Sequence, residues 1–244
     1  MNFKDLIKNK WLLGVIFFLV YTLLINWKFA IVLMVSLGFH ESGHVWAMRR
    51  KGIKTSGFYF VPLFGGMAVA EEQCKSFSQQ AYIAIMGPIW GASLAALTMT
   101  VGILTHNTSC CIIASWMAVF NLFNLLPITF LDGGQIIKTI AVSVSPIKGF
   151  NIINVVTVLT AIATWFYFKS FIIPLAAFIS IQQCLSEKKE YIENNKSLPK
   201  FLNKKEMFYT FVSYLITIIV LSFIFLLSLE STYILSGHRS IMIK

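Results

Sequence analysis

Charged residues are scarce in this chain. They make up 12% of its 244 residues, whereas hydrophobic residues make up 57%. A typical soluble domain is about 45–50% apolar and about 25% charged. So few charges leave too little polar material to cover a surface that faces water, which excludes a single soluble domain. A disordered chain is excluded as well, because disorder requires low hydrophobicity. The composition therefore predicts an integral membrane protein.

The C-x-x-C spacing of cysteines is also absent, and acidic residues are few. The four cysteines include no C-x-x-C pair, so neither a disulfide framework nor a thiolate zinc site is indicated. The adjacent Cys110 and Cys111 are expected to be small buried apolar side chains. Ten acidic residues stand against 20 Lys and Arg, a net charge of +10. In a membrane protein such an excess indicates topology, so no nucleic-acid partner is predicted.

Long apolar stretches are abundant instead, and most approach the roughly 20 residues that a spanning helix requires. With the N-terminus in the cytoplasm, 16 of the Lys and Arg residues fall on the cytoplasmic side and 4 on the opposite side. We therefore expect an all-α multi-pass protein of about six or seven transmembrane helices, in a bacterial inner membrane. The stretches are 11–27, 29–48, 80–104, 110–131, 150–168, 170–185 and 207–229.

Two segments interrupt this pattern. Residues 52–72 are too short and too rich in Gly and Pro to span, and their loose alternation predicts a small membrane-associated β-hairpin after the second helix. Residues 132–149 predict a short amphipathic or re-entrant helix. The expected organisation is an N-terminal helix (1–28), a three-helix catalytic core with the hairpin (29–149), and C-terminal helices (150–244) with a cytoplasmic loop at 186–206.

The second apolar stretch contains the motif His40-Glu41-Ser42-Gly43-His44. Positions i and i+4 lie on one face of a helix, so the two imidazoles could share one metal ion, for which zinc is the usual occupant. Glu41 would lie near that ion, where a base can take a proton from water. A pair of buried, hydrogen-bonded histidines is the structural alternative. Three ionisable groups in five membrane residues favour the metal site.

A third ligand must come from elsewhere, because zinc hydrolases commonly use three protein ligands and leave a fourth position for water. The candidate carboxylates are Asp132, Glu71 and Glu72. Asp132 is favoured: Pro127 disrupts the preceding helical turns, and the glycines after Asp132 let the chain turn sharply. The alternative for Asp132 is the N-cap of the following helix. For Glu71 and Glu72 the favoured alternative is that they cap the end of the hairpin.

These residues resemble the site-2 proteases, the intramembrane zinc metalloproteases of peptidase family M50. The resemblance rests on F-H-E-S-G-H at 39–44 and N-x-x-P-x-x-x-x-D-G at 124–133, with further similarity at Gly87–Pro88 and around 62–66. It implies that His40, His44 and Asp132 bind one Zn²⁺ and that Glu41 is the catalytic base. Thr129 and Phe130 depart from the family, in which a pair containing proline is common at these positions.

The resemblance also implies a substrate. It would be a single-span, membrane-tethered protein, cleaved in or near its transmembrane segment close to the cytoplasmic face. Asn124 would hold the substrate or the oxyanion, and the hairpin at Gly65 and Gly66 would receive a substrate strand. The lipid bilayer and a regulatory membrane protein are the expected partners. The alternatives are a metal-ion transporter or metal-binding membrane protein without peptidase activity, and a catalytically idle scaffold.

Overall fold

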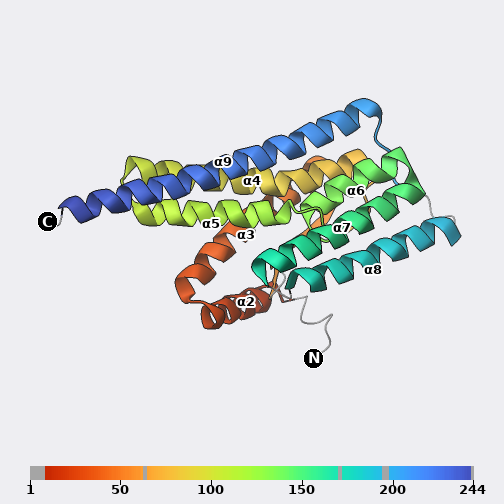
Figure 1. Ribbon diagram of the computed structural model, residues 1–244. Coiled ribbons are helices and arrows are strands. Elements are labelled where there is room, and N and C mark those ends of the chain that lie inside the picture. Colours follow the sequence, from red (N-terminus) through yellow and green to blue (C-terminus); the bar gives the residue numbers. More distant parts are fainter. Residues whose placement is uncertain (1–8, 63–64, 170–171, 194–197, 243–244) are drawn as a thin grey trace. The chain divides into compact units, whose positions relative to one another are not determined.

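The computed structural model describes residues 9–62, 65–169, 172–193 and 198–242, which form eight helices and one two-stranded antiparallel sheet (Figure 1). The mostly helical fold with one small hairpin is as predicted. The helices are α2 (Lys10–Leu24), α3 (Trp27–Arg50), α4 (Phe77–Leu104), α5 (Thr108–Asn124), α6 (Asp132–Val144), α7 (Pro146–Phe168), α8 (Ile172–Glu193) and α9 (Lys204–Met242), and the strands are β1 (Thr55–Val61) and β2 (Gly65–Ala70).

Three helices among the described residues are long and apolar enough to cross a membrane: Phe77–Leu104, Pro146–Tyr167 and Lys204–Gly237. The helices α2 and α5 are apolar but shorter. Helix α3 has a suitable length, and its polar motif between His40 and His44 lowers its mean hydropathy. The total of six or seven spans therefore stays a prediction, although each of the seven apolar stretches contributes to a helix.

The chain divides into two compact units. The first comprises Met1–Glu72, Met86–Leu122 and Ile219–Lys244, and the second comprises Gln73–Ile85 and Phe123–Ile218. Helices α4 and α9 therefore contribute to both units.

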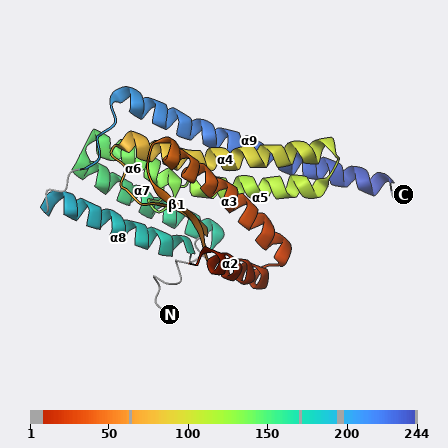
Figure 2. The same cartoon turned by 180° about the vertical axis from the view of Figure 1, so that it is seen from behind.

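In the first unit, the hairpin rests on α2 and α3 (Figure 2). Its register pairs Phe60 with Gly66 and Phe58 with Ala68. The ring of Phe60 packs over Gly38 of α3 and Gly14 of α2, where the missing side chains leave room for it. A cluster of Phe17, Leu33 and Leu37 completes this contact. The hairpin predicted at 52–72 is thus confirmed, and it is fixed by aromatic packing on two helices.

Helices α4 and α5 of the first unit approach each other closely at two glycines of α4. A Cβ atom on Gly91 would overlap the amide group of Asn121, and one on Gly102 would lie 2.8 Å from Sγ of Cys111. Cys111 is fully buried in this contact, as expected for a small apolar side chain. The close approach brings Asn121 into the interior.

In the second unit, α6, α7 and α8 lie side by side (Figure 1). Val142, Phe150 and Cys184 form a core cluster among them. The short helix predicted at 132–149 is present but ends at Val144, and α7 begins at Pro146. The prediction of one helix over 110–131 is wrong at its C-terminal end, because α5 ends at Asn124. Pro127 lacks the N–H that a continuing helix would use there.

Candidate metal centre

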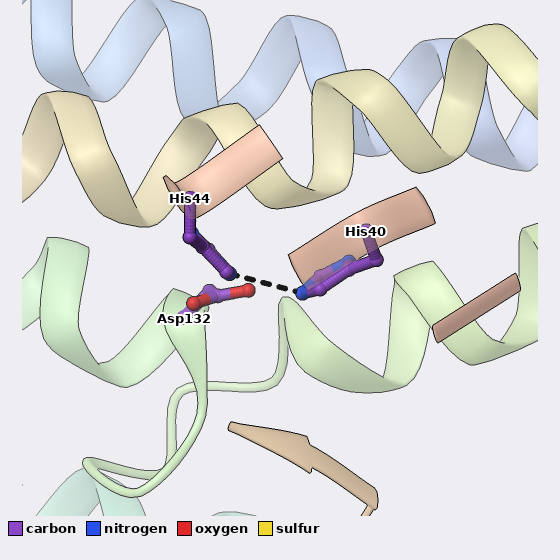
Figure 3. A group of neighbouring side chains, drawn as sticks. All are labelled: His40, His44 and Asp132. Atoms are coloured by element: carbon purple, nitrogen blue, oxygen red, sulfur yellow. Dashed lines mark hydrogen bonds between the residues drawn. The ribbon is translucent and has the colours of Figure 1, made fainter. Parts of the chain in front are cut away.

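His40 and His44 lie one turn apart on α3, and both side chains are buried. Their Nε2 atoms are 3.1 Å apart, as the dashed line in Figure 3 marks. Two imidazoles on a tetrahedral zinc ion, with Zn–N of about 2.0–2.1 Å, have nitrogens about 3.3 Å apart. The pair predicted from its spacing therefore has the separation that a shared ion requires.

Asn121 of α5 fixes the orientation of the His40 ring. Its Nδ2 donates to the carbonyl oxygen of Met117 at 2.7 Å, which identifies its Oδ1 as the acceptor that lies 2.8 Å from His40 Nδ1. His40 must then carry its proton on Nδ1, leaving the lone pair of Nε2 for a metal ion. Sequence reasoning missed Asn121. The local signal is an amide within the apolar second half of α5.

Gly87 of α4 provides the space in front of the two histidines. A Cβ atom there would lie 2.8 Å from His40 Nε2 and closer still to His44 Nε2. Any side chain at this position would therefore occupy the place toward which both ring nitrogens point. The absence of a side chain, together with the Asn121 contact, fits a bound ion.

Glu41 lies between the histidines in sequence and is buried, with 5% of its surface exposed. A Cβ atom on Gly66, near the start of β2, would lie 2.5 Å from Cγ of Glu41. The hairpin therefore closes over the carboxylate, and only glycine allows so close an approach. Gly65 has a φ of +104°, a backbone conformation that favours glycine. Burial of a carboxylate is costly unless the group is paired or functional.

Asp132 is the first residue of α6 and belongs to the group of described residues that could hold a metal ion. His40, His44 and Asp132 each offer one ligand atom, and these atoms lie within 4.8 Å of one another (Figure 3). The alternative role as N-cap is wrong, because Leu131 occupies that position. Two imidazole nitrogens and one carboxylate oxygen form a ligand set that zinc accepts.

Glu71 and Glu72 make contacts within the hairpin, and the predicted role of Asn124 is not tested by the structure. Glu71 Oε1 accepts a hydrogen bond from Ser56 Oγ at 2.7 Å, and Glu72 lies 3.8 Å from the ammonium of Lys54. Both carboxylates thus hold the open end of the hairpin, as the favoured interpretation expected. Asn124 ends α5, and its contact with substrate stays a prediction.

Comparison with known proteins covers the part of the chain that carries His40 and His44. Residues 28–111 match the sequence model of peptidase family M50. The chain is also 32% identical over 117 residues to the protein named "Putative zinc metalloprotease Rip3" in two strains of Mycobacterium tuberculosis, Erdman and H37Rv. This similarity covers 45% of the present chain and 30% of each relative, so the chain spans less than a third of their length.

Proposed function

We propose that this chain, whose resemblance to the M50 peptidases is confirmed over residues 28–111, is an intramembrane zinc metalloprotease. It would hydrolyse peptide bonds in or near the transmembrane segment of membrane-tethered, single-span proteins. The observation that carries the proposal is the arrangement on α3: two buried histidines with Nε2 atoms 3.1 Å apart and a buried glutamate beside the first of them.

His40, His44 and Asp132 would hold the ion. Zinc bound there supplies a Lewis acid, which polarises the scissile carbonyl and lowers the pKa of water. Asn121 supports this by keeping the Nδ1 proton of His40 away from the ion. The first residue of α6 also suits a carboxylate, because the N-terminal end of a helix favours negative charge.

Glu41 is the general base in this proposal. Its carboxylate would take a proton from the attacking water and then return it to the amine that leaves. The burial of Glu41 excludes bulk solvent, which keeps the proton available for the second transfer. Asn124 or N–H groups of the hairpin would stabilise the oxyanion by hydrogen bonds.

The substrate would bind in an extended form along the hairpin. Gly66 lies directly against Glu41, so a strand paired near Gly65 and Gly66 would pass beside the base. A helical substrate must unwind first, because its carbonyls are engaged in i→i−4 hydrogen bonds.

The membrane setting is supported by the three long apolar helices. The ammonium of Lys10, at the start of α2, donates to the carbonyl oxygen of Ser56 in β1, so the basic N-terminal end of α2 lies beside the hairpin. This arrangement supports an N-terminus and an active site that are both near the cytoplasmic face. A multi-pass protein of the bacterial inner membrane, in contact with lipid and a regulatory membrane protein, completes the proposal.

The test uses the full chain in liposomes with a model single-span substrate. Cleavage and bound zinc are measured for the wild type, Glu41→Gln and Asp132→Asn, with Glu71→Gln as the matched carboxylate control. We expect Glu41→Gln to keep zinc but lose cleavage, Asp132→Asn to lose both, and the control to keep both.

Normal cleavage by Glu41→Gln would refute Glu41 as the general base and, with it, the proposed mechanism. Zinc binding by a wild type that cleaves no substrate would favour the transporter or metal-binding alternative. If Asp132→Asn bound zinc as tightly as the wild type, Asp132 would not be the third ligand.

A further inference from the structure

The segment that leads into Asp132 is held by side chains of other helices. Residues 125–131 connect α5 to α6, and four of their backbone groups bond to side chains from α6, α7, α8 and α9. The bonds are Tyr214 Oη to Leu125 O (2.7 Å), Thr157 Oγ1 to Pro127 O (3.4 Å), Gln135 Nε2 to Thr129 O (2.5 Å) and Phe130 N to Ser180 Oγ (2.9 Å). All these residues belong to the second unit.

Ser180 of α8 makes two of the contacts nearest to Asp132. Its Oγ accepts the hydrogen bond from the Phe130 N–H at 2.9 Å, and its carbonyl oxygen accepts one from Thr129 Oγ1 at 3.3 Å. Ser180 is fully buried and Thr129 nearly so. Loss of this hydroxyl would remove the hydrogen bond that joins the Phe130 N–H to α8.

The bonding of Ser180 differs from that of several other helix hydroxyls among the described residues. Ser42, Ser93 and Thr100, for example, each donate to the carbonyl oxygen four residues earlier in the same helix. Such bonds satisfy the hydroxyl locally and fix nothing outside the helix. The Ser180 hydroxyl instead accepts from a residue 50 positions away in sequence.

The start of α6 transmits this restraint to Asp132. A Cβ atom on Gly134 would overlap the backbone of Ile128 and lie 2.4 Å from the nitrogen of Thr129. The segment and the first turn of α6 are therefore in direct backbone contact, and only one peptide group separates Leu131 from Asp132. Movement of the Phe130 peptide would therefore shift the backbone that carries Asp132.

We propose that Ser180 is a positioning residue for Asp132, which sets the direction of the carboxylate and hence the affinity of the metal centre. The inference rests on the proposed function, in which Asp132 is the third ligand. Ligands of a metal must be held within about 0.5 Å of the productive geometry, and loss of a supporting contact typically lowers metal affinity or activity about 10- to 100-fold. Ser180 lies outside residues 28–111 and outside the predicted core.

The test compares the wild type with Ser180→Ala in the full chain. We expect Ser180→Ala to raise the Kd for zinc about 10-fold and to lower kcat at limiting zinc without changing KM, because the lost contact does not face the substrate. Saturating zinc should restore kcat. Ser180→Cys, whose sulfur is a weaker acceptor, should give an intermediate Kd. Amide hydrogen exchange of the metal-free chain should increase locally in peptides that contain Phe130.

Ser228→Ala is the matched control, since Ser228 is equally buried but its Oγ has no hydrogen-bond partner among the described residues. Ser228→Ala should keep the wild-type Kd for zinc and the wild-type amide hydrogen exchange in peptides that contain Phe130. An unchanged zinc Kd in Ser180→Ala, or unchanged amide hydrogen exchange at Phe130, would overturn the inference about Ser180 but not the proposed function. A wild type that binds no zinc would instead overturn the proposed function. Should Ser180→Ala not accumulate, Ser180→Cys supplies the same comparison.

Discussion

The side-chain oxygen of Asn121 lies 2.8 Å from Nδ1 of His40, across 81 positions of sequence. This contact decides which nitrogen of the imidazole carries the proton. Without it both tautomers would be populated, and the tautomer with a proton on Nε2 has no lone pair on that nitrogen to bind a metal ion.

Replacement of Asn121 by Ala should therefore weaken zinc binding about 10- to 100-fold. Zinc titration against a competing chelator measures the change. Asn121→Asp keeps an acceptor for His40 and should lie closer to the wild type, although it loses the donor to Met117. Ser115→Ala is the matched control, because Ser115 is a buried polar residue of the same helix that bonds to its own helix at Ile112. Equal zinc affinity in Asn121→Ala and the wild type would show that the contact does not select the tautomer.

Gly87→Ala should abolish zinc binding while leaving the helices intact. Alanine is more favourable than glycine within a helix by up to about 1 kcal/mol, so α4 itself gains from the change. The added Cβ, however, would collide with Nε2 of both histidines. Bound zinc and circular dichroism are measured together. Gly14→Ala in α2 is the control, since its nearest neighbour would be 3.8 Å away. Normal zinc content in Gly87→Ala would place the ion elsewhere.

Gly66→Ala should separate metal binding from proton transfer. The new Cβ would lie 2.5 Å from Cγ and 2.7 Å from Oε1 of Glu41, which must move or push the hairpin away. We expect zinc content to be unchanged and kcat to fall at least about 100-fold, in the range typical of general base catalysis. Ala70→Ser, an exposed change at the end of the same strand, serves as the control. Wild-type turnover by Gly66→Ala would mean that Glu41 does not need this contact.

Substrates whose transmembrane helix is interrupted by Gly, Pro or Asn near the cut should be cleaved faster than uninterrupted Leu/Ala helices. The buried Glu41 and the adjoining strand would accept an extended backbone, and unwinding a stable helix adds to the barrier. Two model substrates that differ only at the interruption are compared at equal density in the same liposomes. Equal rates would count against an extended bound form.

Local patterns predicted the part of this molecule that depends on local geometry. The spacing of His40 and His44 places two rings on one face of any helix, and the glycines and prolines of 52–72 indicate a turn between short strands. Contacts between distant segments have no such signature. The Asn121 bond and the Ser180 bonds join residues 81 and about 50 positions apart, and no periodicity encodes them.

The predicted apolar span 110–131 extends beyond the end of α5 at Asn124, because hydrophobicity alone does not distinguish a membrane helix from a buried connecting segment. The N-cap role that is the alternative for Asp132 follows from its residue type alone, whereas Leu131 occupies the N-cap position of α6. A Cβ on Gly133 or Gly134 would overlap the backbone of Leu125 or Ile128, so the helix starts where these glycines meet the segment.

Phe60 connects the metal centre to the packing of the hairpin on α2 and α3. Its ring is seated between Gly14 and Gly38, and its partner in the sheet is Gly66, the residue that adjoins Glu41. The position of the hairpin therefore depends on how this aromatic ring packs on α2 and α3. A force that parts α2 from α3, such as a change in bilayer thickness or the binding of a neighbouring helix, would lift Gly66 from the base. The position of Gly66 beside Glu41 would then depend on the spacing between α2 and α3.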